Sequence, residues 1–244
     1  MKRLLKKPFS TALGLVISGL LISGLATQAH AMGDYDPEVL KVTGDQLEYR
    51  FHEGEKAQVF EGDITYGNSF NKFRLKADAE RHEGETEELN LQALWLHAIS
   101  PYWDLQLGLS RDIHPDPVRN RLVAGFDGLA PYFFETDASL LIDNDGRTSL
   151  SITAEKELMF TQKLVLSPEF SLGAHSSTSE KYGEGKGLAN IGVGLRLKYE
   201  IVREFAPYVG AVWSRSFGDS ADMIREGGGD IQSTQWVAGV SFWF

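Results

Sequence analysis

Residues 236–244 read Trp-Val-Ala-Gly-Val-Ser-Phe-Trp-Phe, and this stretch decides the fold class. Every second residue counted back from Phe244 is apolar, whereas the residues between them are small or mixed. A period of two with one apolar face indicates a β-strand whose apolar side is turned away from water. An aromatic residue that ends such a strand is typical of the closing strand of a bacterial outer-membrane β-barrel, where it lies in the interfacial girdle.

The opposite end of the chain carries the pattern of an export signal. Basic residues come first, then an uncharged apolar run at 9–26, then Ala-His-Ala at 29–31. The basic residues are Lys2, Arg3, Lys6 and Lys7. This order predicts a secretory signal peptide over 1–31, cleaved after Ala31. A membrane anchor is the alternative, but serines and glycines interrupt the run and the cleavage site follows it directly. Because no other apolar stretch is long enough for a spanning helix, we expect the mature chain to cross the membrane as strands.

The composition fits an exported barrel. The chain has no cysteine, so it forms neither a disulfide nor a thiolate metal site. Its formal net charge is −10, and removal of the signal peptide makes it more negative by four. Such an acidic chain is a poor nucleic-acid binder. An acidic surface is able to attract metal cations, but ordinary solvation of that surface is the interpretation we favour.

Alternation of apolar and polar residues continues through the mature chain and predicts twelve strands. They cover 47–52, 60–66, 73–80, 89–95, 103–110, 122–126, 132–142, 149–155, 163–172, 191–200, 209–213 and 236–244. We therefore expect an all-β fold, a single transmembrane antiparallel up-and-down barrel over 46–244, after a short polar segment at 32–45. Ten strands is the alternative, because Leu94 and Leu96 make the fourth strand apolar on both faces.

The predicted connections differ between the two ends of the barrel. Short turns are expected at 67–68, 100–101, 129–130, 160–161 and 202–203, and long polar loops at 111–120, 176–186 and 219–232. Short periplasmic turns opposite long outer loops are what a transmembrane barrel requires. The same alternation places charges of both signs inside the barrel. We favour a lumen largely filled by salt bridges over a carboxylate-lined conduit or cation site.

Four stretches resemble the copper-resistance protein B family. They are Ala93 to Gly108, Phe-Asp-Gly-Leu-Ala-Pro-Tyr at 126–132, Phe-Thr-Gln-Lys-Leu-Val-Leu-Ser-Pro-Glu at 160–169, and Gly194 to Gly210 with its Lys-Tyr-Glu-Ile-Val-Arg-Glu-Phe-Ala-Pro-Tyr. The resemblance covers about 47–244. It implies an outer-membrane barrel that is encoded with periplasmic copper-handling proteins and serves copper resistance and homeostasis. Its implied partners are copper ions, outer-membrane lipid and those periplasmic proteins.

One departure from the family bears on the metal ligands. Members often carry a Met- and His-rich segment before the barrel, whereas 32–45 offers only Met32 and no histidine. If copper is bound, the barrel must supply the ligands. We expect a copper-ion site at the outer mouth, since imidazole suits Cu(II) and carboxylates favour a cation. Its predicted ligands are His52, His82, His114 and His175, helped by Glu80; scattered polar surface histidines are the competing interpretation.

Two other functions deserve comparison. Outer-membrane phospholipases place a His and a Ser two residues apart on an outward strand, and His175-Ser-Ser177 has that spacing but lacks the Asn-Gly that follows it there. We therefore expect no enzyme. A general outer-membrane channel, or a structural barrel with no metal site, is the more serious alternative to a copper protein.

Overall fold

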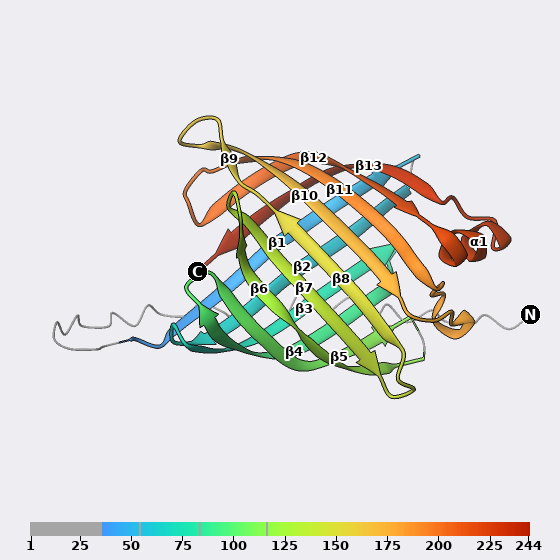
Figure 1. Ribbon diagram of the computed structural model, residues 1–244. Coiled ribbons are helices and arrows are strands. Elements are labelled where there is room, and N and C mark those ends of the chain that lie inside the picture. Colours follow the sequence, from blue (N-terminus) through green and yellow to red (C-terminus); the bar gives the residue numbers. More distant parts are fainter. Residues whose placement is uncertain (1–35, 54, 83, 116) are drawn as a thin grey trace, which may run out of the picture. The chain divides into compact units, whose positions relative to one another are not determined.

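The computed structural model describes residues 36–53, 55–82, 84–115 and 117–244. The predicted signal peptide and Met32 lie outside these residues. Twelve long antiparallel strands form one closed sheet (Figure 1). They are β1 (Val39–His52), β2 (Glu55–Gly67), β3 (Asn71–His82), β4 (Glu85–Ser100), β5 (Trp103–His114), β6 (Arg119–Ala130), β7 (Phe134–Asp143), β8 (Thr148–Glu155), β10 (Leu164–His175), β11 (Gly187–Tyr199), β12 (Phe205–Ser216) and β13 (Gln232–Trp243). Because β1 pairs with β13 and β10 with β11, every long strand has two neighbours, so the predicted twelve-strand barrel is confirmed and ten strands is wrong.

A thirteenth, two-residue strand, β9 (Leu158–Met159), pairs with β10 beyond the end of β8. Pro168 of β10 lies where the two pieces separate. Its carbonyl accepts a hydrogen bond from the backbone nitrogen of Lys156. The N–H and C=O of a strand residue point to the same neighbouring strand, so proline has no N–H to donate on the side of β8 and β9. The ladder therefore breaks here, and β8 and β9 are two parts of one side of the sheet.

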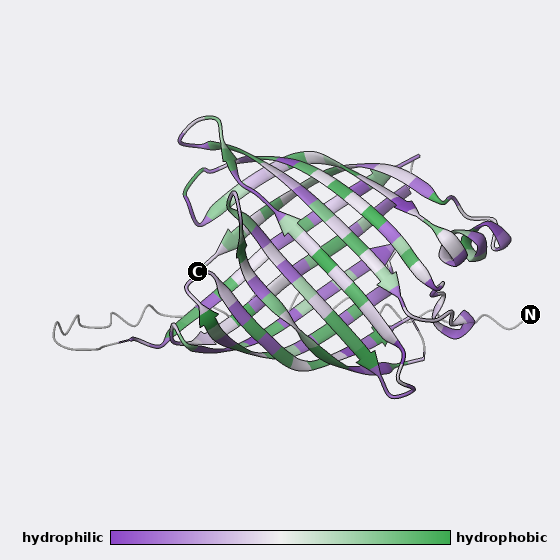
Figure 2. Cartoon of the chain, viewed as in Figure 1, coloured by the Kyte–Doolittle hydropathy of each residue, from purple (hydrophilic) through white to green (hydrophobic). Residues whose placement is uncertain are grey.

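The two faces of the sheet differ in polarity, as Figure 2 shows by the alternating colours along the strands. Large apolar side chains cover the outside; Leu75, Leu109 and Trp236 are 60%, 61% and 68% exposed. Inward positions hold buried polar groups such as Gln106 and Ser110. An apolar exterior around a polar interior is the distribution that a lipid-facing barrel requires.

The first strand begins earlier than the sequence indicates. β1 starts at Val39, so 39–45 belongs to the sheet and not to a separate polar segment. The pairing of β1 with β2 shifts register between Gly44 and Gln46, and both Asp45 and Gln46 line the interior. This bulge inverts the alternation, which is why the period of two is visible only from Leu47 onward.

The seam between β1 and β13 closes the barrel as the C-terminal pattern predicts. Phe244 continues the ladder, with its backbone nitrogen and oxygen 2.9 and 2.8 Å from the oxygen and nitrogen of Val42. The Phe242 ring lies against Gly44, where a Cβ atom would come within 2.5 Å of it. A larger residue at this position would force the Phe242 ring to move.

The long connections lie at one end of the barrel, as predicted, but that end also has the short connections 53–54, 83–84, 115–118 and 144–147, so short turns are not confined to the other end. Short turns join strands at the end where β1 starts, at 68–70, 101–102, 131–133, 160–163 and 200–204. The opposite end holds the long segments 176–186, with the 3-10 helix η1 (Glu180–Tyr182), and 217–231, with α1 (Gly218–Glu226). The predicted loop 111–120 is wrong: β5 runs to His114 and β6 starts at Arg119, because Arg111 and Asp112 pair with Asn120 and Arg119 across the strands.

Within the described residues, no helix has the length and apolar character needed to cross a bilayer.

Candidate functional site

The barrel interior contains two cavities, one above the other along the lumen. The loop-side chamber, of about 600 Å³, reaches the ends of β5 and β6, and the turn-side chamber, of about 560 Å³, reaches the turn at 101–102. Both are lined by Glu61, Lys76, Asp137 and Thr153. These four residues form the waist of the lumen, where the chambers adjoin.

The lining of both chambers is acidic. Seven carboxylates and four Lys or Arg side chains line the loop-side chamber, and nine carboxylates and four such bases line the turn-side chamber. A cleft lined mostly by one sign of charge, with low-dielectric walls, concentrates ions of the opposite sign. The lumen therefore favours cations over anions along its length.

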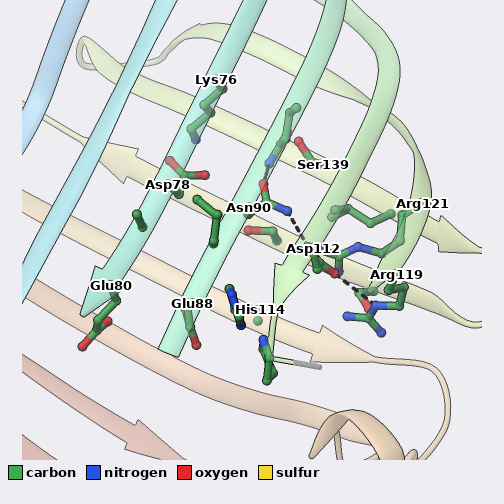
Figure 3. Close-up of a pocket in the computed structure, with 18 of the residues that line it drawn as sticks. Lys76, Asp78, Glu80, Glu88, Asn90, Asp112, His114, Arg119, Arg121 and Ser139 are labelled. Atoms are coloured by element: carbon green, nitrogen blue, oxygen red, sulfur yellow. Dashed lines mark hydrogen bonds and ion pairs between the residues drawn. The ribbon is translucent and has the colours of Figure 1, made fainter. Parts of the chain in front are cut away.

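Lys76 is the basic residue of the waist. It is on β3, next to Asp78 in the inward register, and Figure 3 shows both side chains in the loop-side chamber. The backbone of Lys76 is paired in the sheet, but its ammonium group has no hydrogen bond or ion pair with any residue that the structure describes. One carboxylate oxygen of Asp78 is buried and likewise finds no partner among them. The waist thus holds charges of both signs that are not joined in fixed pairs.

The other side of the lumen is filled by a paired cluster. Arg196 of β11 donates to Glu48 of β1 at 3.1 and 3.2 Å and to Glu169 of β10 at 2.6 Å. Glu48 also accepts from Arg50 at 2.7 Å and from Tyr208 at 2.9 Å. The Glu48 and Arg196 side chains are 0% and 4% exposed. This cluster confirms the predicted salt bridges, but only for part of the lumen.

The structure brings three of the five predicted metal ligands into one cavity. Glu80, His114 and His175 line the loop-side chamber, and Glu80 lies opposite Glu88 on the neighbouring strand (Figure 3). His52 and His82 end β1 and β3 on the barrel rim and are not part of this lining. Within the described part of the chain, no group of three or more His, Asp or Glu side chains is already arranged to hold a metal ion.

The histidines have different local partners. Nδ1 of His175 is 2.9 Å from Oγ of Ser149 and 3.8 Å from a carboxylate oxygen of Glu184. Nδ1 of His52 is 2.9 Å from the carbonyl oxygen of Thr234, and Nδ1 of His82 is 2.9 Å from Glu87. With respect to the described residues, the contact of each of these three rings is made by Nδ1, which leaves Nε2 as the nitrogen to offer a metal. His175 faces the lumen, so it does not have the outward position of a phospholipase histidine.

Sequence reasoning missed five charged residues of this chamber: Glu88, Asp112, Arg119, Arg121 and Glu184. Asp112 and Arg119 were assigned to a loop, and Glu184 lies in a real loop that folds back to the lumen. Arg119 and Arg121 are two residues apart at a strand start, and that spacing could have signalled a charged inward face.

Residues 38–244 match the family model described as copper resistance protein B precursor (CopB). The chain belongs to the copper resistance protein B family. It is 36% identical over 217 residues to copper resistance protein B of Escherichia coli, covering 89% of this chain and 73% of that protein. It is 34% identical over 200 residues to the copper resistance protein B homolog of Pseudomonas syringae pv. tomato (strain ATCC BAA-871 / DC3000), covering 82% of this chain and 68% of that protein.

Solved structures with the same fold include two porins. NanC porin superposes with a TM-score of 0.55 at 12% identity, over 84% of this chain and 99% of that one. KdgM porin superposes with a TM-score of 0.51 at 11% identity, over the same shares. At these identities the likeness concerns the fold alone, which is that of an outer-membrane barrel. The copper resistance B family and a porin-like fold together favour a non-enzymatic role.

Proposed function

We propose that this copper resistance B protein resides in the outer membrane, is exported by a signal peptide cleaved after Ala31, and binds or passes copper ions through its lumen. The observation that carries the proposal is the acidic loop-side chamber, which presents two imidazoles to the lumen of a barrel from this family. Imidazole nitrogen and carboxylate oxygen are ligands that Cu(II) accepts. The excess of carboxylates supplies the field that draws the ion in.

Within this proposal the five predicted ligands have two roles. His114 and His175 supply the nitrogens of the chamber and Glu80 supplies a carboxylate, since all three line it. His52 and His82 lie on the rim and would capture ions before they reach the chamber. Because the groups are not prearranged as a closed site, we expect weak, reversible binding, which suits passage better than storage.

Copper binding by the purified barrel tests the assignment. His114→Ala with His175→Ala should lose most Cu(II) affinity, and His52→Ala with His82→Ala should lose less. His97→Ala is the matched control, because His97 stacks on Trp95 and its Nδ1 donates to Oδ1 of Asn71, away from the chamber. Isothermal calorimetry gives the affinities. Unchanged affinity in the His114/His175 variant would overturn the assignment.

A general channel is the second candidate, because the two chambers adjoin at the waist. It predicts ion conductance that copper does not alter. Conductance of reconstituted barrels with and without micromolar Cu(II) separates the candidates: a block that disappears in the His114/His175 variant supports the copper protein, and no block supports the general channel.

A further inference from the structure

The segment between β10 and β11, residues 176–186, does not extend away from the barrel. Its Tyr182 and Glu184 side chains line the loop-side chamber together with residues of β3 to β8. The segment is tightened on itself, with the backbone nitrogen of Ser179 2.7 Å from the oxygen of Glu184 and the backbone nitrogen of Glu184 3.1 Å from the oxygen of Ser179. We call it the strap.

The strap is hydrogen-bonded to β6, which is not a neighbour of either strand that the strap connects. Arg119 of β6 donates two hydrogen bonds to the Glu184 carboxylate, at 2.8 and 2.6 Å, and its Nε donates to Asp112 of β5 at 3.1 Å. In the sheet order, β7 and β8 lie between β6 and β10. The strap therefore reaches over the ends of two strands, and because its side chains line the cavity it passes across the mouth. A two-pronged Arg–carboxylate contact is the strongest common form of this pair and fixes orientation as well as distance.

An aromatic contact supports the same fastening. The Tyr182 ring lies with its centroid 4.3 Å from the Arg119 guanidinium carbon and 5.3 Å from that of Arg147. Arg147, in the turn after β7, is itself held by Asp143 at 2.8 Å and by Ser179 of the strap at 3.2 Å. Guanidinium groups over a tyrosine face add attraction that strengthens as water is excluded.

The outer side of the strap is held by α1. Oγ of Ser220 is 2.9 Å from the backbone nitrogen of Gly185, and Thr178 donates to Asp219 at 2.8 Å. A Cβ atom on Gly185 would lie 1.9 Å from the backbone nitrogen of Ser220, so only glycine allows this approach. The strap is thus packed from both sides, which is not the arrangement of a freely moving loop.

Burial alone would raise the pKa of Glu184, but the hydrogen bonds from Arg119, the nearby His175 and the Arg119 and Arg121 charges together hold that pKa below its ordinary value. The carboxylate is therefore ionised, and its contact with Arg119 intact, well into the acidic range.

We propose that the strap restricts the loop-side mouth to ion-sized solutes, with the Arg119–Glu184 pair as the latch that holds it in place. The inference rests on the proposed function, in which the lumen is a path for ions, and it names the size class of what passes. Arg119 and Glu184 act as positioning residues, since they determine where Tyr182 and the strap backbone lie.

Conductance in planar bilayers and arabinose-driven swelling of proteoliposomes test the proposal together. Glu184→Gln combined with Tyr182→Ala should raise KCl conductance severalfold and admit arabinose, whereas the unaltered barrel should conduct ions and exclude the sugar. Asp222→Asn is the matched control, because it breaks an exposed Arg225 pair on α1 and should change neither readout. Heat-modifiable gel mobility confirms that each barrel is folded.

Arg119→Lys keeps the charge but loses the two-pronged contact, and it should give an intermediate conductance. Folded double-variant barrels with the conductance and sugar exclusion of the unaltered protein would overturn the proposal, as would an Arg119→Lys variant indistinguishable from it. Copper affinity measured on the same samples separates the two ideas: if the unaltered barrel binds no copper and the double variant still opens the mouth, the proposed function fails while the strap remains.

Discussion

The two sides of the lumen wall carry the same kinds of side chains and use them differently. On β1 and β10 to β13, Glu48 and Arg196 are buried and each bonds to several partners. On β2 to β8, Lys76 and Asp78 line open chambers, and one oxygen of Asp78 is left without a partner among the described residues. Charged residues inside a barrel therefore have no single role.

The difference follows from what surrounds each charge. Gly239 lies beside Glu48 and Tyr208, and a Cβ atom there would come within 2.7 Å of the Glu48 side chain. A small neighbour such as Gly239 lets the Glu48 carboxylate and the Arg196 guanidinium come into direct contact. Opposite charges attract more strongly at short distance and where water is excluded.

Arg74–Asp127 and Lys72–Asp104 close in the same way on the β2 to β8 side. The Lys76 ammonium group and one oxygen of Asp78 differ, because neither has a fixed partner among the described residues.

Breaking the paired cluster should have the largest effect on stability. Arg196→Met leaves the half-buried Glu169 without its cation and leaves the fully buried Glu48 with only Arg50 as a cation, which should cost about 3–5 kcal/mol in the free energy of unfolding. Lys198→Met on the same strand is the control: its partner Glu155 is 33% exposed, and the loss should be about 1 kcal/mol or less. Urea unfolding in lipid vesicles, followed by tryptophan fluorescence, measures both. Equal losses in the free energy of unfolding would show that the Arg196 cluster contributes no more to stability than the more exposed Lys198–Glu155 pair.

Removing the waist cation should mainly change ion selectivity. A unit charge about 6 Å from a passing ion contributes roughly 1–3 kcal/mol at dielectric values between protein and water. Lys76→Met should therefore raise the cation-to-anion permeability ratio severalfold. Lys72→Met is the control, because Lys72 is already paired with Asp104 at 2.6 Å. Reversal potentials in a KCl gradient give the permeability ratio. A larger change of this ratio in Lys72→Met than in Lys76→Met would contradict the claim that Lys76 at the waist controls ion selectivity.

Acid should release the strap, and this is the smallest expected effect. Because the pKa of Glu184 is lower in the folded protein than in the unfolded chain, its contribution to stability is present above the ordinary glutamate pKa. That contribution is lost only as pH falls through the lowered value. Conductance should therefore stay constant from pH 7 down to the ordinary glutamate range and rise only below that range. Glu184→Gln should remove the rise, and an identical acid response in that variant would assign it to other groups.

The fold was predictable because alternation is a local property. The lipid face of β13, from Trp236 to Phe242, is visible in the sequence, and so is the even strand count. The exceptions are places where contacts with another strand determine the local structure. The bulge at Gly44 to Gln46 conceals the start of β1, and the charged pair Asp112–Arg119 resembles a loop until the two strands are in register.

The site was predictable only in part for the same reason. Glu80, His114 and His175 share a chamber because barrel closure brings β3, β5 and β10 around one space, and sequence could place each near the outer mouth. It could not show that His52 and His82 remain on the rim. Nor could it place Glu184, whose position depends on the strap crossing to Arg119.

Copper accumulation in living cells tests most directly whether the lumen handles copper. Cells that lack the protein would be complemented with the unaltered chain, with the variant that replaces His52, His82, His114 and His175 by Ala, or with His97→Ala, and cellular copper and tolerance would be measured after exposure. We predict that the unaltered chain and His97→Ala change copper content and restore tolerance equally, and that the four-histidine variant, although folded and inserted, does neither. Full complementation by that variant would contradict a copper path that depends on these histidines.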